Sequence, residues 1–200
     1  VDHTILYDVY ILYHDFTESD IAKDLYRKLT EKGLRVWIDC ESILPGTSRD
    51  EGFKRGLMMS KVFVCLLSRS LKETNMMDWT PDSEHHHFIT WSRLALELHE
   101  HGFIQAICPV MIGDKIEDDV YSNYFDSDCA PLAPEISVRA IDQMTTKCMD
   151  EEGMGWPYHD TMTVKDIISK ISEKPIGLIE GSLDHALEAI VISLMNTVNI

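Results

Sequence analysis

The chain has 200 residues, 44% of them hydrophobic and 26% charged, with a formal net charge of −16. This composition predicts one soluble globular domain, and the negative charge argues against nucleic acid or an anionic membrane surface as a partner, because phosphate contacts need clustered Lys and Arg. Five scattered cysteines without a CxxC pair predict free thiols in a reducing, cytoplasmic compartment. No apolar run approaches the roughly 20 residues that span a bilayer, so no membrane segment is expected.

The first third of the chain predicts a β-α-β-α-β succession. Short runs rich in Val, Ile and aromatic residues are typical of strands, and apolar residues three or four positions apart between these runs are typical of amphipathic helices. Right-handed crossovers between such strands give a parallel sheet. We expect strands at 7–13, 34–38 and 61–67, and helices at 17–33 and 49–60.

The middle of the chain continues this alternation after an interruption. A polar stretch at 69–90 precedes a helix predicted at 91–101. A strand is predicted at 103–112, and Pro109 within it indicates an edge strand or a bulge, because proline donates no hydrogen bond to a ladder.

The last part of the chain is less regular. Residues 113–162 are acidic and rich in turn residues, with short helical pieces expected near 120–125 and 142–149. Another helix is predicted at 163–171. Gly181-Ser182 is expected to cap a final helix, whose apolar stripe consists of Leu183, Ala186, Leu187, Ile190 and Leu194.

The segment RVWIDCESILPGTS, residues 35–48, starts as a strand and ends as a turn. Asp39 and Glu41 stand just before the break at Pro45-Gly46. In open α/β sheets, ligands and partners bind at loops that follow the carboxyl ends of strands. This loop is therefore either a site or an ordinary connection with solvated acids.

These motifs and their order resemble the Toll/interleukin-1 receptor (TIR) domain family. Tyr7-Asp8-Val9 is similar to the family's first signature box, and 35–46 is similar to its second; the match is good over 7–113 and looser beyond. The resemblance implies a flavodoxin-like α/β fold, with a central parallel five-stranded sheet, helices on both faces and a C-terminal helical extension. We expect a TIR core over 1–160, with the C-terminal helices of 161–200 packed on the same domain.

TIR domains serve two classes of function, and the resemblance implies both here. Some recruit other TIR domains, and others, once assembled, cleave the nicotinamide–ribose bond of NAD⁺ with one glutamate on the third helix. We expect homotypic assembly through Leu44, Pro45 and Gly46, together with NAD⁺ cleavage to nicotinamide and ADP-ribose or a cyclic form. NAD⁺ is then a substrate, and no cofactor is expected. The alternative is a non-catalytic scaffold that only recruits other TIR domains.

The catalytic glutamate can be sought in two registers. Many NAD⁺-cleaving members carry it four residues after a tryptophan, which from Trp91 leads to Ala95, whereas a Glu-Leu pair selects Glu97. We favour Glu97 because a core-facing leucine stripe leaves it on the helix flank beside Arg93, from which it is expected to reach the carboxyl edge of the sheet. A plainer interpretation makes Glu97 a solvated carboxylate paired with Arg93.

One carboxylate suffices for this chemistry. Breaking the N-glycosidic bond builds oxocarbenium-like charge on the ribose, which a carboxylate stabilises, and nicotinamide leaves as a neutral molecule. In the favoured register Trp91 moves into the loop before the helix. The resemblance implies substrate contacts by Tyr13, His14, Asp39, Glu41, Gly46, Ser48 and Trp91.

Two further features have plain interpretations. Trp37 is expected to pack in its strand rather than to contact substrate. The triplet His85-His86-His87 raises the question of a metal, but adjacent histidines point in different directions and no Cys or second His lies at helix spacing nearby, so no metal site is expected.

Overall fold

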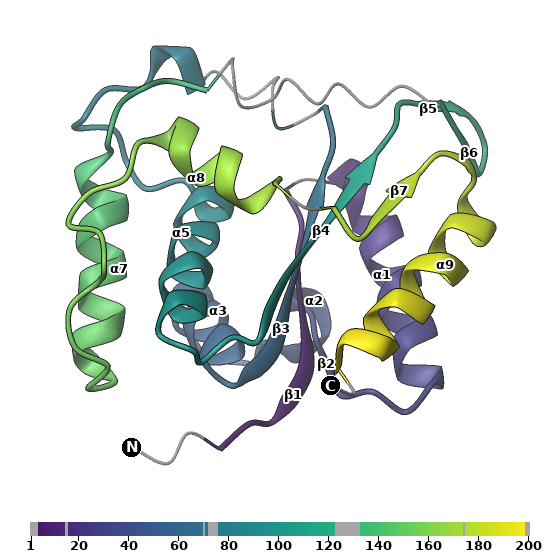
Figure 1. Cartoon of the computed structure of the whole chain (residues 1–200), viewed down its shortest axis with the longest axis horizontal. Coiled ribbons are helices and arrows are strands. Elements are labelled where there is room, and N and C mark those ends of the chain that lie inside the picture. Colours follow the sequence, from purple (N-terminus) through teal and green to yellow (C-terminus); the bar gives the residue numbers. More distant parts are fainter. Residues whose placement is uncertain are drawn as a thin grey trace.

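The computed structural model describes residues 4–14, 16–69, 71, 76–122, 133–173 and 175–198, and a five-stranded parallel sheet forms its centre (Figure 1). From one edge to the other the strands are β2 (Val36–Trp37), β1 (Tyr7–Leu12), β3 (Ser60–Leu67), β4 (Ala106–Ile112) and β7 (Gly177–Ile179). All neighbouring pairs are parallel. This is the flavodoxin-like strand order, and it confirms the expected fold class.

Helices cover both faces of the sheet (Figure 1). One face carries α1 (Phe16–Glu31) and α9 (Leu183–Val198), and the other carries α3 (Arg49–Met58) and α5 (His87–Glu100). None of the helices within the described ranges is both long enough and apolar enough to cross a bilayer.

Two more helices form an outer layer on the α5 side. They are α7 (Arg139–Glu151) and α8 (Val164–Ile171), and both pack against α5 (Figure 1). Thr163 caps α8 through a capping box with Asp166. These two helices confirm the predictions made near 142–149 and at 163–171.

Alternate residues of the central strands divide between the two layers. Val9 and Ile11 of β1 pack with α1 and α9, whereas Tyr10 and Leu12 pack with α3 and α5. Strand side chains point alternately to opposite faces, and here both faces are covered. The nearly unbroken apolar runs of the sequence follow from this arrangement.

Pro109 lies in an internal strand, not in the expected edge strand. β4 is flanked by β3 and β7, and the Pro109 carbonyl accepts a hydrogen bond from the Ile176 amide at 2.9 Å. In a parallel ladder the N–H and C=O of one residue point to the same neighbour. The position where Pro109 lacks an N–H therefore faces β7, and pairing with β7 starts only at Val110 with Gly177. The hydrogen bonds between β4 and β3 are not affected by the proline.

A small antiparallel sheet replaces two other predictions. It consists of β5 (Lys115–Glu117), β6 (Val120–Tyr121) and β8 (Gly181–Ser182), so the start of the piece at 120–125 is a strand and not a helix, while 123–125 lie outside the described residues. Gly181-Ser182 pairs with β6 immediately before α9 instead of serving simply as a cap. Local sequence patterns do not show a pairing between segments so far apart in the chain.

An aromatic cluster joins the sheet to α3 and α5. Tyr10 stacks on Trp37 with ring centroids 4.4 Å apart, Phe53 packs its edge against Trp37 at 5.1 Å, and Phe53 also stacks on Trp91 at 5.9 Å. Trp37 is thus a packing residue, as expected. α3 approaches it so closely that a Cβ added at Gly56 would lie 2.3 Å from an indole carbon of Trp37.

We expect Gly56→Ala to lower the free energy of unfolding by about 1–3 kcal/mol, because the new methyl group overlaps a ring that its neighbours hold in place. Gly52→Ala is the matched control in the same helix, since its Cβ would lie 2.9 Å from Cγ1 of the partly buried Ile43, a smaller overlap than the one at Gly56. There the gain in helix propensity, about 0.5–1 kcal/mol, offsets part of the contact, so the loss is expected to be smaller than for Gly56→Ala. Urea denaturation measures both variants, and equal stability of Gly56→Ala and wild type would contradict the close approach.

Candidate functional site

A pocket of about 380 Å³ lies at the carboxyl edge of the parallel sheet. It forms where β1 ends, where β2 leads into the short helix α2 (Asp39–Ser42), and where α3 and α5 begin. Helices of a parallel α/β fold start at this edge, which brings their first turns to the pocket. The lining residues are Tyr13, His14, Ser19, Asp39, Arg49, His86, His87 and Phe88.

Asp39 is the one carboxylate among these lining residues. Its Oδ1 accepts hydrogen bonds from the Tyr13 hydroxyl at 2.6 Å and from the Cys40 amide at 2.8 Å, and its Oδ2 lies 3.5 Å from Nη2 of Arg49. Burial and then the bond to Asp39 raise the pKa of Tyr13 well above its ordinary value. The phenol therefore stays protonated and holds the carboxylate in place.

Two imidazoles at the start of α5 are neutral at neutral pH. Burial, followed by the nearby His14, lowers the pKa of His86 to about 4, and burial followed by the charge of Arg49 lowers the pKa of His87 to about 4. His86 stacks on His14 with centroids 5.3 Å apart. Nδ1 of His87 accepts a hydrogen bond from the Trp91 indole at 3.0 Å.

The structure brings together three of the residues named from the sequence as substrate contacts: Tyr13, His14 and Asp39. Three other predicted substrate contacts, Glu41, Gly46 and Ser48, do not line the pocket. Glu41 is exposed on α2, and Gly46 forms a turn at φ +86°. Ser48 caps α3 by accepting a hydrogen bond from the Glu51 amide at 3.2 Å.

Trp91 belongs to the core. It lies within α5, because this helix starts at His87 rather than at residue 91, and its side chain is fully buried. The expected displacement of Trp91 into a loop is therefore wrong. Its indole supports the pocket from within the core, through His87 and Phe53.

The Glu97 carboxylate is fully buried and binds residues outside the pocket. It forms an ion pair with Arg93 one turn earlier in α5, accepts a hydrogen bond from the Tyr158 amide at 2.7 Å, and contacts the amide and Nδ1 of His159 at 3.3 and 3.1 Å. Arg93 in turn donates to the His159 carbonyl at 2.7 Å. The pairing with Arg93 agrees with the plainer interpretation from the sequence, but the expected solvation is wrong: the side chains of Glu97 and Arg93 are 0% and 1% exposed.

Helix geometry separates Glu97 from the pocket. α5 meets the pocket at His87, and Glu97 lies ten residues further along the helix. At 1.5 Å per residue this separation is about 15 Å. The sequence predicted that Glu97 reaches the carboxyl edge of the sheet, and this prediction is wrong. The Glu-Leu register selects a position near the far end of the helix.

Several lining residues were missed from the sequence: Ser19, Arg49, His86, His87 and Phe88. The signal that could have found most of them is positional, since the first turn of each helix after a parallel strand faces the carboxyl edge. Placing the start of α5 at residue 91 concealed 86–88. Arg49 directly follows the N-cap Ser48, and its position was open to the same argument.

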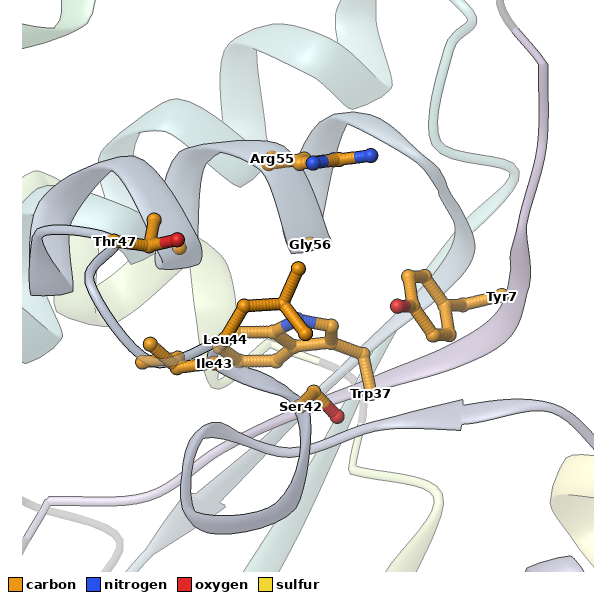
Figure 2. A pocket seen from close by; sticks show the side chains of 9 residues that line it. Tyr7, Trp37, Ser42, Ile43, Leu44, Thr47, Arg55 and Gly56 are labelled. Carbon is orange, nitrogen blue, oxygen red and sulfur yellow. The ribbon is translucent and has the colours of Figure 1, made fainter.

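A second hollow, of about 110 Å³, lies beside the loop between α2 and α3 (Figure 2). Trp37, Ile43 and Leu44 supply most of its apolar lining, and Tyr7 and Arg55 also line it. Leu44 is 62% exposed. The loop thus presents an apolar side chain and an apolar hollow next to each other.

Two groups in the described ranges have the residue types and spacing to hold a metal ion. One consists of Asp50, His85 and His87, and the other consists of Glu97, Glu100 and His159. The second group is poorly suited, because the Glu97 carboxylate already binds Arg93 and the Tyr158 amide.

We expect Glu97→Gln to lower the free energy of unfolding by about 3–5 kcal/mol at neutral pH, because it removes the nearest counter-ion of the buried Arg93 and leaves only Asp142, whose Oδ1 lies 3.9 Å from Nε of Arg93. Burial raises the pKa of Glu97, but the hydrogen bond and charge of Arg93, followed by Tyr158 and His159, outweigh burial and hold this pKa below its ordinary 4.5. A lowered pKa stabilises the fold above 4.5 and loses its contribution as the pH falls through the folded-state value. Urea denaturation from pH 7 down to acidic pH measures both effects.

Glu100→Gln is the control for this experiment. It removes a partly exposed carboxylate from the same helix and is expected to cost about 0–1 kcal/mol. Equal stability of the two variants at neutral pH would show that Glu97 is not part of a buried pair.

Comparisons with known proteins identify the family. A family model described as TIR domain matches residues 9–132, while no curated protein gives a significant match. Among solved structures, the TIR domains of the activated Roq1 resistosome that recognises the pathogen effector XopQ align with a TM-score of 0.58 and 13% identity, over 95% of this chain and 98% of that chain. A metazoan TIR-STING receptor from C. gigas aligns with a TM-score of 0.40 and 15% identity, over 74% of this chain and 42% of that chain. The likeness to Roq1 shows the fold, and the family match spans more than half of the sequence. The chain therefore belongs to the TIR domain family.

Proposed function

We propose that this chain is a signalling module that acts by homotypic TIR–TIR assembly through the loop between α2 and α3. The observation that carries the proposal is Leu44, which is 62% exposed beside the exposed Pro45-Gly46 turn. Apolar surface in water costs roughly 25 cal/mol per Å², and contact with a partner removes this cost.

The loop is held in one shape before any partner binds. The Thr47 amide donates to the Leu44 carbonyl at 3.1 Å, and Gly46 adopts the positive φ that the turn requires. Ser48 then fixes the start of α3. A preorganised loop loses little conformational entropy on binding.

The hollow that Leu44 helps to line supports a contact with a neighbouring copy. Trp37 and Ile43 also line it, so it offers an apolar seat for a side chain of that copy (Figure 2). If the seated side chain comes from a different surface of the copy, the contact runs head to tail and builds rings or open filaments. The cysteines within the described ranges are free thiols, which supports a cytoplasmic location for such an assembly.

We expect Leu44→Asp to lower the self-association constant by about 10-fold or more, because it places a charge at the centre of an apolar contact. Ile192→Asp is the matched control: it makes the same change at an apolar residue of α9 that is 60% exposed, and adds the same charge to a chain of net charge −16. Pro45→His tests the turn itself. Sedimentation velocity measures all three, and equal effects of Leu44→Asp and Ile192→Asp would remove this loop from the interface.

We propose NAD⁺ cleavage in the pocket as a second function, on one specific observation. Asp39 holds a carboxylate in the pocket, next to the protonated phenol of Tyr13 and near the guanidinium of Arg49. In this proposal Asp39 takes the role that the sequence had suggested for Glu97, and Glu97 positions α5 without touching the substrate.

The reaction needs little beyond this arrangement. NAD⁺ and water give nicotinamide, ADP-ribose and a proton; in the cyclic variant an internal nucleophile replaces water. As the N-glycosidic bond breaks, positive charge develops on the ribose, and Asp39 stabilises it while accepting a hydrogen bond from a ribose hydroxyl. Arg49 pairs with a phosphate.

We expect assembled wild type to release nicotinamide from NAD⁺, and Asp39→Asn to release it about 100-fold more slowly, since it removes the charge that stabilises the transition state. Glu97→Gln is the comparison, assayed at a temperature where circular dichroism shows it folded, and is expected to keep its rate per folded molecule. Loss of release in Glu97→Gln with retention in Asp39→Asn would reverse the assignment. No release from assembled wild type would leave the scaffold function alone.

A further inference from the structure

Two histidines and one aspartate meet between α3 and the start of α5. Asp50 lies in the first turn of α3, and His85 and His87 stand on either side of His86, the N-cap of α5. Nε2 of His85 lies 3.7 Å from Oδ2 of Asp50, and Nδ1 of His87 lies 3.7 Å from Oδ1. One potential ligand atom from each residue lies within 4.8 Å of the other two.

Asp50 supplies what the histidine triplet lacks by itself. The neighbours of the triplet in the chain include no Cys or His at helix spacing that could complete a site. The fold, however, brings Asp50 to the triplet from a different helix. His85 and His87 are alternate residues of the segment that leads into α5, and both lie near the same carboxylate. Three ligands therefore converge from two elements.

The spacing of these atoms suits a tetrahedral divalent cation. Bonds of about 2.0–2.1 Å in tetrahedral geometry place neighbouring donor atoms about 3.3–3.4 Å apart. The two distances of 3.7 Å run to different oxygens of Asp50, and the three ligand atoms lie within 4.8 Å of one another, so binding needs a rotation of the Asp50 carboxylate as well as a closer approach of the two rings. The side chain of Asp50 is 42% exposed, which permits this rotation. An octahedral ion with similar bonds needs donors about 3.0 Å apart, which is a larger rearrangement.

The atom of His87 nearest Asp50, Nδ1, carries a lone pair that the Trp91 indole occupies with a hydrogen bond. The Trp91 indole donates to Nδ1 of His87, which places the proton of this ring on Nε2 and leaves Nδ1 as the acceptor. A cation at Nδ1 displaces the indole from this atom, so metal binding also changes the surroundings of Trp91. Arg49, the residue before Asp50, lies over the ring of Phe53 and next to Asp39, and its charge also acts on His87, so it opposes a cation at this atom.

We propose that Asp50, His85 and His87 bind one Zn²⁺, with water in the fourth position. Two imidazoles and one carboxylate form a ligand set that zinc accepts, and the partial exposure of all three side chains leaves the fourth position open to solvent. The ion ties the first turn of α3 to the start of α5, the two elements that frame the pocket. This site stands independently of assembly and of NAD⁺ cleavage.

The test is isothermal titration of metal-free protein with zinc chloride, together with the visible absorption spectrum after substitution by Co²⁺. We expect one ion per chain and the intense d–d bands of tetrahedral cobalt. Asp50→Asn and His85→Gln are each expected to weaken zinc binding by about 10-fold or more, since even an outer-shell partner is worth that much. Both residues are partly exposed, and circular dichroism checks that the variants remain folded.

Two control variants separate this site from general attraction of cations to an acidic protein. His86→Gln changes the middle histidine, which lies outside the three-ligand cluster, and Glu100→Gln changes the second candidate cluster. Both are expected to bind zinc as wild type does. No stoichiometric binding by wild type, wild-type affinity in Asp50→Asn, or an equal loss in either control would each overturn the proposal. If His85→Gln fails to fold, Asp50→Asn decides the outcome.

Discussion

A buried pair of opposite charges, Arg93 and Glu97, constrains much of this domain. Two opposite charges removed from water persist only if they pair with each other and form further hydrogen bonds. Here Arg93 and Glu97 form the pair, and the backbone of 158–159 supplies the further hydrogen bonds. Those bonds fasten the segment between α7 and α8 onto α5. α5 is thereby held against both the outer helices and the sheet, and its first turn is fixed beside the pocket. The location of the histidines at 85–87 depends on this placement.

One short stretch of chain joins the proposed site to the proposed interface. Asp39 at the start of α2 and Arg49 at the start of α3 contact each other in the pocket, while Leu44 in the loop between these two helices is exposed. The loop is therefore closed at its base by a charge-assisted contact and apolar at its tip. The Tyr13–Asp39 bond connects its base to the end of β1. The pocket and the exposed tip thus belong to one short segment, 39–49.

The sequence predicted the sheet and the main helices because local periodicity follows from burial on two faces, and it predicted the family through the resemblance of its motifs. Predictions failed where a partner lies far away in the chain. Pro109 suggested an edge strand, but its missing donor faces the side where β7 begins to pair. Residues 120–121 form a strand because 181–182 pair with them. In the site, the resemblance named Tyr13, His14 and Asp39, and the structure places all three in the lining of one pocket, while their contact with a substrate stays a prediction. Glu97 was misplaced because a motif register ignored the length of the helix, along which each residue adds about 1.5 Å.

Glu97 belongs to a buried ion pair, and Asp39 is the carboxylate of the pocket. The most direct test is NMR observation of the side-chain carboxyl carbons of both residues, first during a pH titration and then during addition of NAD⁺. We expect Glu97 to titrate below its ordinary pKa of 4.5 and its resonance to stay unchanged on addition of NAD⁺, whereas we expect the Asp39 resonance to shift. A Glu97 carboxyl that titrates like a solvated glutamate, and shifts when NAD⁺ is added, would contradict this assignment.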